Sequence, residues 1–160
     1  MRSITVLCVG KLKEPYWREA CAEYAKRLGA FCRFSIVEVD EERVPDKVSP
    51  AQIRAAVEAE GRRLLAKAAP QALLVPLCIE GKEFSSPALA GWLEEQAVCG
   101  RGDAVFIIGG SWGLSEEVKR AGALWLSMSP MTFPHQLARV MLCEQIYRAM
   151  QIISGGKYHK

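Results

Sequence analysis

Residues 104–113 read Ala-Val-Phe-Ile-Ile-Gly-Gly-Ser-Trp-Gly, five apolar residues that run directly into a glycine-rich segment. The uninterrupted apolar run predicts a strand buried on both faces, because half-exposed strands alternate apolar and polar residues. The glycines predict a tight loop whose backbone a ligand can approach closely. This loop lacks both the G-x-G-x-x-G spacing and the Gly-Lys-Ser/Thr ending of phosphate-binding loops. It therefore favours a ligand without phosphates, with a plain tight turn as the alternative.

The same alternation of short apolar runs and longer amphipathic segments extends to both sides of this stretch. Further strands are expected at 4–9, 34–39, 72–79 and 123–128, and helices at 14–28, 50–69, 86–98, 115–121 and 135–153. Strands that alternate with helices predict an α/β fold in which a mainly parallel sheet carries helices on both faces. We expect a single domain over residues 1–160.

Two features of this pattern indicate where a ligand binds. Pro76 falls inside an expected strand and predicts an irregular one, because proline cannot donate to the strand ladder. Ligands of parallel sheets bind beyond the carboxyl ends of the strands. That rule selects three loops, at 78–83, 109–114 and 129–136.

Composition and charge are those of an ordinary soluble protein. Half of the residues are hydrophobic, 24% are charged, and the net charge of +3 permits a phosphate-bearing partner without requiring one. None of the six cysteines forms a C-x-x-C pair, so they are interpreted as small buried hydrophobes in a reducing compartment, with no metal site; they are Cys8, Cys21, Cys32, Cys78, Cys99 and Cys143. No signal peptide and no apolar stretch of about 20 residues is apparent. We therefore expect a cytoplasmic protein that binds no membrane.

The last part of the chain concentrates groups suited to chemistry. Both histidines, His135 and His159, lie there, and histidine is the commonest side chain for proton transfer near neutral pH. The alternatives are a helix-start residue for His135 and a frayed, solvated tail for His159. The helix expected between them is apolar almost all round, so it needs cover on more than one side, and this predicts a subunit interface.

The four tryptophans are scattered along the chain. Trp17, Trp92 and Trp125 are interpreted as core residues. Trp112 lies within the glycine loop, where it is either exposed beside the ligand or available to a nucleobase.

Several segments carry a resemblance that covers the whole chain. Residues 4–13 read Ile-Thr-Val-Leu-Cys-Val-Gly-Lys-Leu-Lys, residues 127–136 read Ser-Met-Ser-Pro-Met-Thr-Phe-Pro-His-Gln, and residues 158–160 are Tyr-His-Lys. With the Gly109-Gly110 loop and the segment 144–149, they make the sequence similar to the RlmH family. This is a family of bacterial large-subunit ribosomal RNA pseudouridine N3-methyltransferases in the SPOUT superfamily. The combination of Met-Thr-Phe-Pro-His-Gln with the terminal Tyr-His-Lys is specific, whereas either part alone is weak.

The resemblance implies a fold feature, a cofactor and partners. It implies a C-terminal trefoil knot, bound S-adenosylmethionine, a homodimer, and methylation of N3 of a pseudouridine on the assembled ribosome, where the subunits join. The cofactor contacts that it places in this chain are Leu77, Gly109, Met128, Ser129, Pro130, Met131, Thr132 and Phe133. Pro130 and Cys78 depart from the family pattern. Contacts at position 130 are expected through the backbone, and the effect of Cys78 is left open.

The chemistry requires that the weakly acidic N3–H of the base lose its proton as the methyl group arrives. A base, or a donor to the uracil carbonyls, assists such a step. Arg139, Tyr158 and His159 are the catalytic candidates, and the residues expected to contact substrate are His135, Arg139, Lys157 and Lys160. Two alternatives stay open: a non-enzymatic ribosome-associated RNA-binding protein that uses the same basic surface, and a SPOUT enzyme for transfer RNA. The short N-terminal segment argues against the second.

Overall fold

Strands and helices alternate along the whole of the computed structural model, which describes residues 1–160. The strands are β1 (Ser3–Val9), β2 (Arg33–Val39), β3 (Leu73–Glu83), β4 (Ala104–Ile108) and β5 (Leu126–Ser127). The helices are α1 (Pro15–Leu28), α2 (Pro50–Lys67), α3 (Ser86–Val98), α4 (Glu116–Arg120) and α5 (His135–Ile153). The expected α/β alternation is confirmed.

All five strands belong to one parallel sheet with the order β2-β1-β4-β3-β5. The apolar stretch that predicted β4 is buried at every position, in keeping with its place in the middle of the sheet. Because every strand runs in the same direction, the carboxyl ends meet at one edge, where the selected loops begin. The trefoil knot implied by the resemblance stays a prediction.

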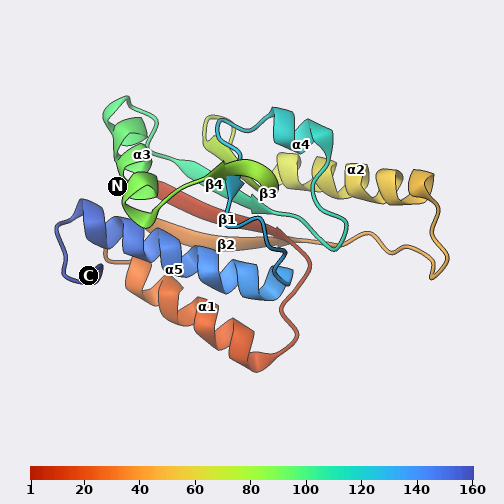
Figure 1. Cartoon of the computed structure of the whole chain (residues 1–160), viewed down its shortest axis with the longest axis horizontal. Helices are drawn as coiled ribbons and strands as arrows, with labels where there is room; N and C mark the ends of the chain where they lie inside the picture. Colours follow the sequence, from red (N-terminus) through yellow and green to blue (C-terminus); the bar gives the residue numbers. More distant parts are fainter.

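Helices cover both faces of this sheet, as Figure 1 shows. Ile4, Val6 and Phe106 project into the larger core, which is closed by residues of α1, α3 and α5. Their sequence neighbours Leu7 and Val105 project the opposite way, into a smaller core closed by α2 and α4. Alternate residues of the central strands are thus buried on alternate faces, which explains why these strands are apolar throughout.

Strand β3 follows the expected irregular course, but it is longer than predicted. Residues from Leu73 to Pro76 pair with β4, and from Leu77 onward the strand pairs with β5 across a register shift before Lys82. Pro76 is thus the last residue that pairs with β4. The segment selected as a loop at 78–83 is instead strand, because β3 continues to Glu83.

The last strand and two cysteines also correct the sequence analysis. A strand was expected at 123–128, and β5 spans only Leu126–Ser127. Four cysteines are buried as expected, but Cys78 is half-buried and Cys99 is exposed. Cys99 follows the last residue of α3 at the surface, and Cys78 lies on β3 after that strand has left β4. None of the helices combines the length and the apolar character needed to cross a membrane.

Candidate functional site

A cavity of about 690 Å³ opens at the carboxyl ends of β3 and β4. Its walls come from the end of β3, the glycine loop and the segment that leads into α5, the three regions selected from the sequence. Of the eight predicted cofactor contacts, all except Pro130 line it: Leu77, Gly109, Met128, Ser129, Met131, Thr132 and Phe133. Its volume falls within the roughly 300–1,000 Å³ of small-ligand sites. Folding therefore gathers these predicted residues around one space.

The glycine loop forms a tight turn whose backbone lines this cavity. The Gly113 N–H donates to the Gly110 carbonyl at 3.1 Å, and Gly113 has a φ of +83°, a conformation that favours glycine. A Cβ placed on Gly109 would lie 2.7 Å from the Gly113 carbonyl oxygen. No side chain fits at position 109 unless the turn opens, so the backbone itself forms the wall.

The buried Glu60 carboxylate lies directly against this turn. Glu60 on α2 is 6% exposed, and its Oε2 accepts a hydrogen bond from the Glu42 N–H at 2.9 Å. A Cβ on Gly110 would lie 3.4 Å from both carboxylate oxygens, which shows how closely the turn approaches them. Burial is the main reason that the pKa of Glu60 is raised. An acidic residue in an amphipathic helix is expected to face solvent, so this contact could not be predicted from the sequence.

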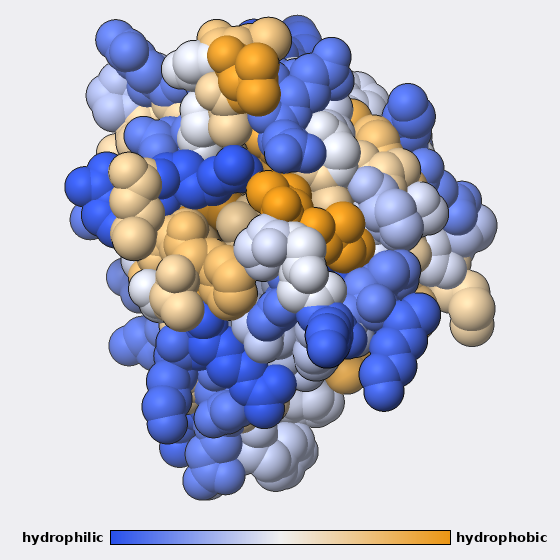
Figure 2. All heavy atoms as spheres, turned by 90° about the vertical axis from the view of Figure 1, so that its left-hand side faces the viewer, coloured by the Kyte–Doolittle hydropathy of each residue, from blue (hydrophilic) through white to orange (hydrophobic).

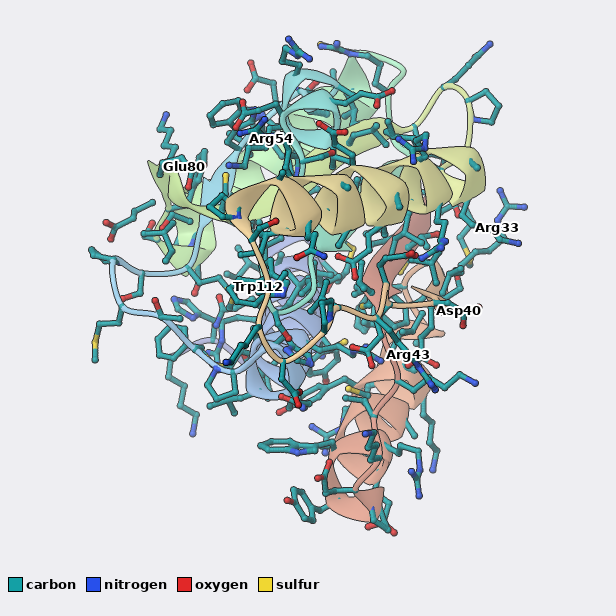
Figure 3. All side chains as sticks on the ribbon, turned by 90° about the vertical axis from the view of Figure 1, so that its right-hand side faces the viewer. Arg33, Asp40, Arg43, Arg54, Glu80 and Trp112 are labelled. Atoms are coloured by element: carbon teal, nitrogen blue, oxygen red, sulfur yellow. The ribbon has the colours of Figure 1, made fainter.

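An ion pair on the cavity wall was also missed. Lys119 and Glu80 both line the cavity, with Nζ 2.5 Å from Oε1, and Glu116 lies 3.7 Å from the same Nζ. Their hydrogen bond lowers the pKa of Glu80 and raises that of Lys119. Figure 3 shows Glu80 at the end of the molecule where the strands terminate. Because Lys119 is already neutralised, the cavity still offers no free cation for a phosphate.

The start of α5 places His135 at the cavity and withdraws Arg139 from it. His135, the first residue of α5, lines the cavity. One turn later the Arg139 side chain is only 3% exposed; its Nη1 donates to Glu38 at 2.7 Å and its Nη2 to the Gly10 carbonyl at 3.2 Å. The expectation that Arg139 contacts phosphate at the surface is corrected, because a buried, paired guanidinium is not accessible. Its visible role is to tie α5 to the carboxyl ends of β1 and β2.

In the C-terminal tail Tyr158 packs against the core, whereas His159 and Lys160 after it are exposed, so His159 remains solvated as in the alternative interpretation. Tyr158 donates its hydroxyl to Glu144 at 3.1 Å, and its ring meets that of Tyr147 edge-on at 4.8 Å between centroids. Arg148 pairs with Glu144, lies over the Tyr158 ring at 4.8 Å, and contacts Nδ1 of His159 at 3.2 Å. Burial and the bond to Glu144 raise the pKa of Tyr158 to about 12. Tyr158 and His159 therefore both contact side chains of α5 within a single chain.

The two lysines expected to contact substrate, Lys157 and Lys160, are both exposed. They belong to the end of the molecule that carries both termini, which Figure 2 shows face-on. Hydrophilic residues cover most of the margin of this face, with hydrophobic ones toward its middle. The lysines are thus free to meet a phosphate, in contrast to Arg139.

A single chain does not bring Tyr158 and His159, two of the predicted catalytic residues, to the cavity. The nineteen residues of α5 span about 28 Å at 1.5 Å per residue. His135 lies at the cavity end of this helix, whereas Tyr158 and His159 follow its other end (Figure 1). Completing such a site requires either a large movement or a second chain.

Comparison with known proteins assigns the fold family. A family model described as a predicted SPOUT methyltransferase matches residues 1–159. The chain belongs to the SPOUT methyltransferase family. The match confirms the resemblance at the level of this family.

The solved structures similar to this SPOUT chain include a protein assigned as a methyltransferase, Lpg2936 from Legionella pneumophila, in complex with the bound cofactor SAM. Sequence identity is 15%, and the TM-score is 0.48. The match covers 96% of this chain and 66% of that protein. The family assignment rests on the sequence match and not on this likeness.

Proposed function

We propose that this SPOUT protein is an S-adenosylmethionine-dependent methyltransferase that acts on N3 of a pseudouridine in large-subunit ribosomal RNA, as the RlmH family does. The observation that carries the proposal is the cavity. In a chain that matches the methyltransferase family, folding gathers all but one of the predicted cofactor residues around it.

The residues around the cavity fit this cofactor. The wall is a mixture of apolar side chains and glycine backbone, which suits an adenine and a ribose. Glu80, whose side chain is half-exposed beside its partner Lys119, offers an acceptor to the ammonium group of the amino-acid tail. When bound, the cofactor supplies the methyl group of the reaction.

The tail residues suit hydrogen-bond donation better than proton abstraction. With a pKa of about 12, Tyr158 is protonated at neutral pH. Arginine is always a donor, so Nδ1 of His159 accepts from Arg148 and the ring proton sits on Nε2. His159 can therefore donate from Nε2 to a uracil carbonyl, and Tyr158 can do so once its single hydroxyl proton leaves Glu144. Such donation would spread the charge that develops as the N3 proton leaves. Positioning of base and methyl donor supplies much of the remaining acceleration.

The proposed working unit is a homodimer built on α5. Val140 and Met141 of this helix are half-buried and line a groove of about 460 Å³ together with Tyr24 and Phe84. A partner packed antiparallel along α5 would cover this groove and bring its own tail toward the cavity, across the distance that one chain cannot span. Light scattering should give about twice the 17.7 kDa chain mass. A monomer at micromolar concentration contradicts the dimer.

Calorimetry with S-adenosylmethionine tests the cofactor directly. We expect one site per competent cavity, and no detectable heat at millimolar cofactor refutes the proposal. A protein that binds RNA without catalysing a reaction needs no cofactor, so the same titration separates the enzyme from the non-enzymatic alternative.

The proposed substrate is the assembled ribosome. The net charge is only +3, and contacts to phosphates carry no sequence information by themselves. Selection of one nucleotide must then rest on the shape of folded RNA and ribosomal proteins. Labelled methyl transfer should be strongest to whole ribosomes, weaker to isolated large subunits, and weakest to protein-free RNA and to transfer RNA. Equal transfer to protein-free RNA contradicts shape selection, and preferred transfer to transfer RNA replaces the substrate.

A further inference from the structure

Large apolar side chains are exposed at six positions, of which two line the cavity and a third lies on the turn beside it. Ile79 is 53% exposed, Trp112 49% and Met131 70%. They come from the end of β3, the glycine loop and the segment after β5, so three separate parts of the chain each contribute one. Single exposed apolar residues are ordinary, but their concentration around one opening marks a binding surface.

Trp112 stands outside the cavity on a firmly held turn. Its neighbours Ser111 and Gly113 line the cavity, whereas Trp112 itself does not. The turn that carries it is closed by the Gly113–Gly110 hydrogen bond and packs so closely that a Cβ on Gly110 would lie 3.1 Å from Val9. The indole is therefore exposed beside the cavity and is not part of its lining. Only its own side-chain torsions need to be ordered when a partner binds.

We propose that Trp112 stacks on an unpaired nucleobase of the RNA substrate at the mouth of the cavity, with Ile79 and Met131 enclosing that base from the sides. The inference rests on the proposed function, because a base must reach this opening to meet the methyl donor. Recognition of single-stranded nucleotides commonly uses an aromatic ring on which a base stacks. An indole face accepts any base, so Trp112 supplies affinity and positioning rather than sequence choice.

The charges around the turn agree with stacking as the main contact. In the view of Figure 3, Trp112 lies between the labelled Arg54 of α2 and Arg43 of the loop before it, and both arginines are exposed. The same loop also carries Asp40, Glu41, Asp46 and Lys47, and its Glu42 pairs with Arg63 of α2, so the surface there is of mixed charge. Electrostatic attraction is weak on such a mixed surface, so an apolar, aromatic contact has to hold the nucleotide.

The test compares Trp112→Ala with Trp112→Phe and with Val98→Ala, which removes an exposed apolar group from the end of α3. Methyl transfer is measured on ribosomes that carry unmethylated pseudouridine. For Trp112→Ala we expect KM for ribosomes to rise between about fivefold and a hundredfold, the range of one base–aromatic stack. Trp112→Phe should recover most of the loss, because it keeps an aromatic face. Val98→Ala should match the wild type.

Two further measurements distinguish failure of the stacking role from failure of the proposed function. Affinity for S-adenosylmethionine should stay within about twofold of the wild type in Trp112→Ala, and light scattering should show the same mass. An unchanged KM for ribosomes overturns the stacking role and leaves the proposed function standing. A shift in mass overturns it in favour of an indole that covers a second copy of the chain. Absence of transfer by the wild-type enzyme refutes both the proposed substrate and the stacking role.

Discussion

Replacing Gly109 with alanine tests the cavity through a single added carbon. The new Cβ would lie 2.7 Å from the Gly113 carbonyl oxygen and 3.0 Å from Leu114 Cδ2, and a contact below 3.0 Å forces something to shift. The nearest atom is backbone, so the turn itself has to open. Overpacking of this kind costs about 1–3 kcal/mol of the free energy of unfolding.

The same displacement should weaken cofactor binding, because the Gly113 backbone that must move also lines the cavity. We expect the Kd for S-adenosylmethionine to rise at least about tenfold, equivalent to about 1.4 kcal/mol. Calorimetry measures this affinity, and urea denaturation measures the stability of the same preparation. At this chain length, the melting temperature should fall by about 2–4 °C for each kcal/mol.

Gly91→Ala is the matched control, since a Cβ there meets nothing within 4 Å. In the middle of α3 the change should raise the free energy of unfolding by about 0.5–1 kcal/mol, because alanine is the better helix former. Cofactor affinity should not change. If Gly109→Ala binds the cofactor as tightly as the wild type, the glycine turn is not part of the site and the assignment of the cavity is refuted.

Three more changes test the surroundings of the site. Because the pKa of Glu60 is raised in the folded protein, its contribution to the free energy of unfolding is greatest below the ordinary carboxyl pKa and is lost as the pH rises above it. Glu60→Gln should remove this loss. The urea midpoint of the variant should therefore be higher than that of the wild type at pH 7 but not at pH 4. Arg139→Met leaves Glu38 without its partner and should lower the free energy of unfolding by about 2–4 kcal/mol, less than for a fully buried pair because Glu38 is 35% exposed; an unchanged urea midpoint would contradict the structural role. Deletion of residues 158–160 should abolish methyl transfer while calorimetry still shows cofactor binding, and full activity of the shortened chain would remove the tail from the mechanism.

The cofactor region could be predicted from the sequence because it lies at strand ends. In a parallel sheet all carboxyl ends share one edge, so locating the strands also locates the loops that meet. The apolar run at 104–108 identified the central strand, and Pro76 marked where β3 leaves β4. These are local signals, and each is determined by residues that are close together in the chain.

The contacts missed from the sequence join residues that are far apart. Arg139 and Glu38 are 101 positions apart and Lys119 and Glu80 are 39 apart. Nothing local therefore distinguishes these ion pairs from unpaired, solvated charges. Glu60 points inward only because the glycine turn packs on α2.

Residues 158–160 show the same contrast between what the local sequence predicts and what tertiary packing produces. Tyr-His-Lys at a terminus predicts fraying from position alone, and only the packing against Tyr147 and Glu144 orders Tyr158. The order of strands and helices and the edge of the sheet where the loops meet follow from the local sequence, because periodicity and turn chemistry act over a few residues; the ends of β3 and β5 do not. Which charged groups are buried, and how far the tail lies from the cavity, was decided only by tertiary structure, since both depend on which elements pack together.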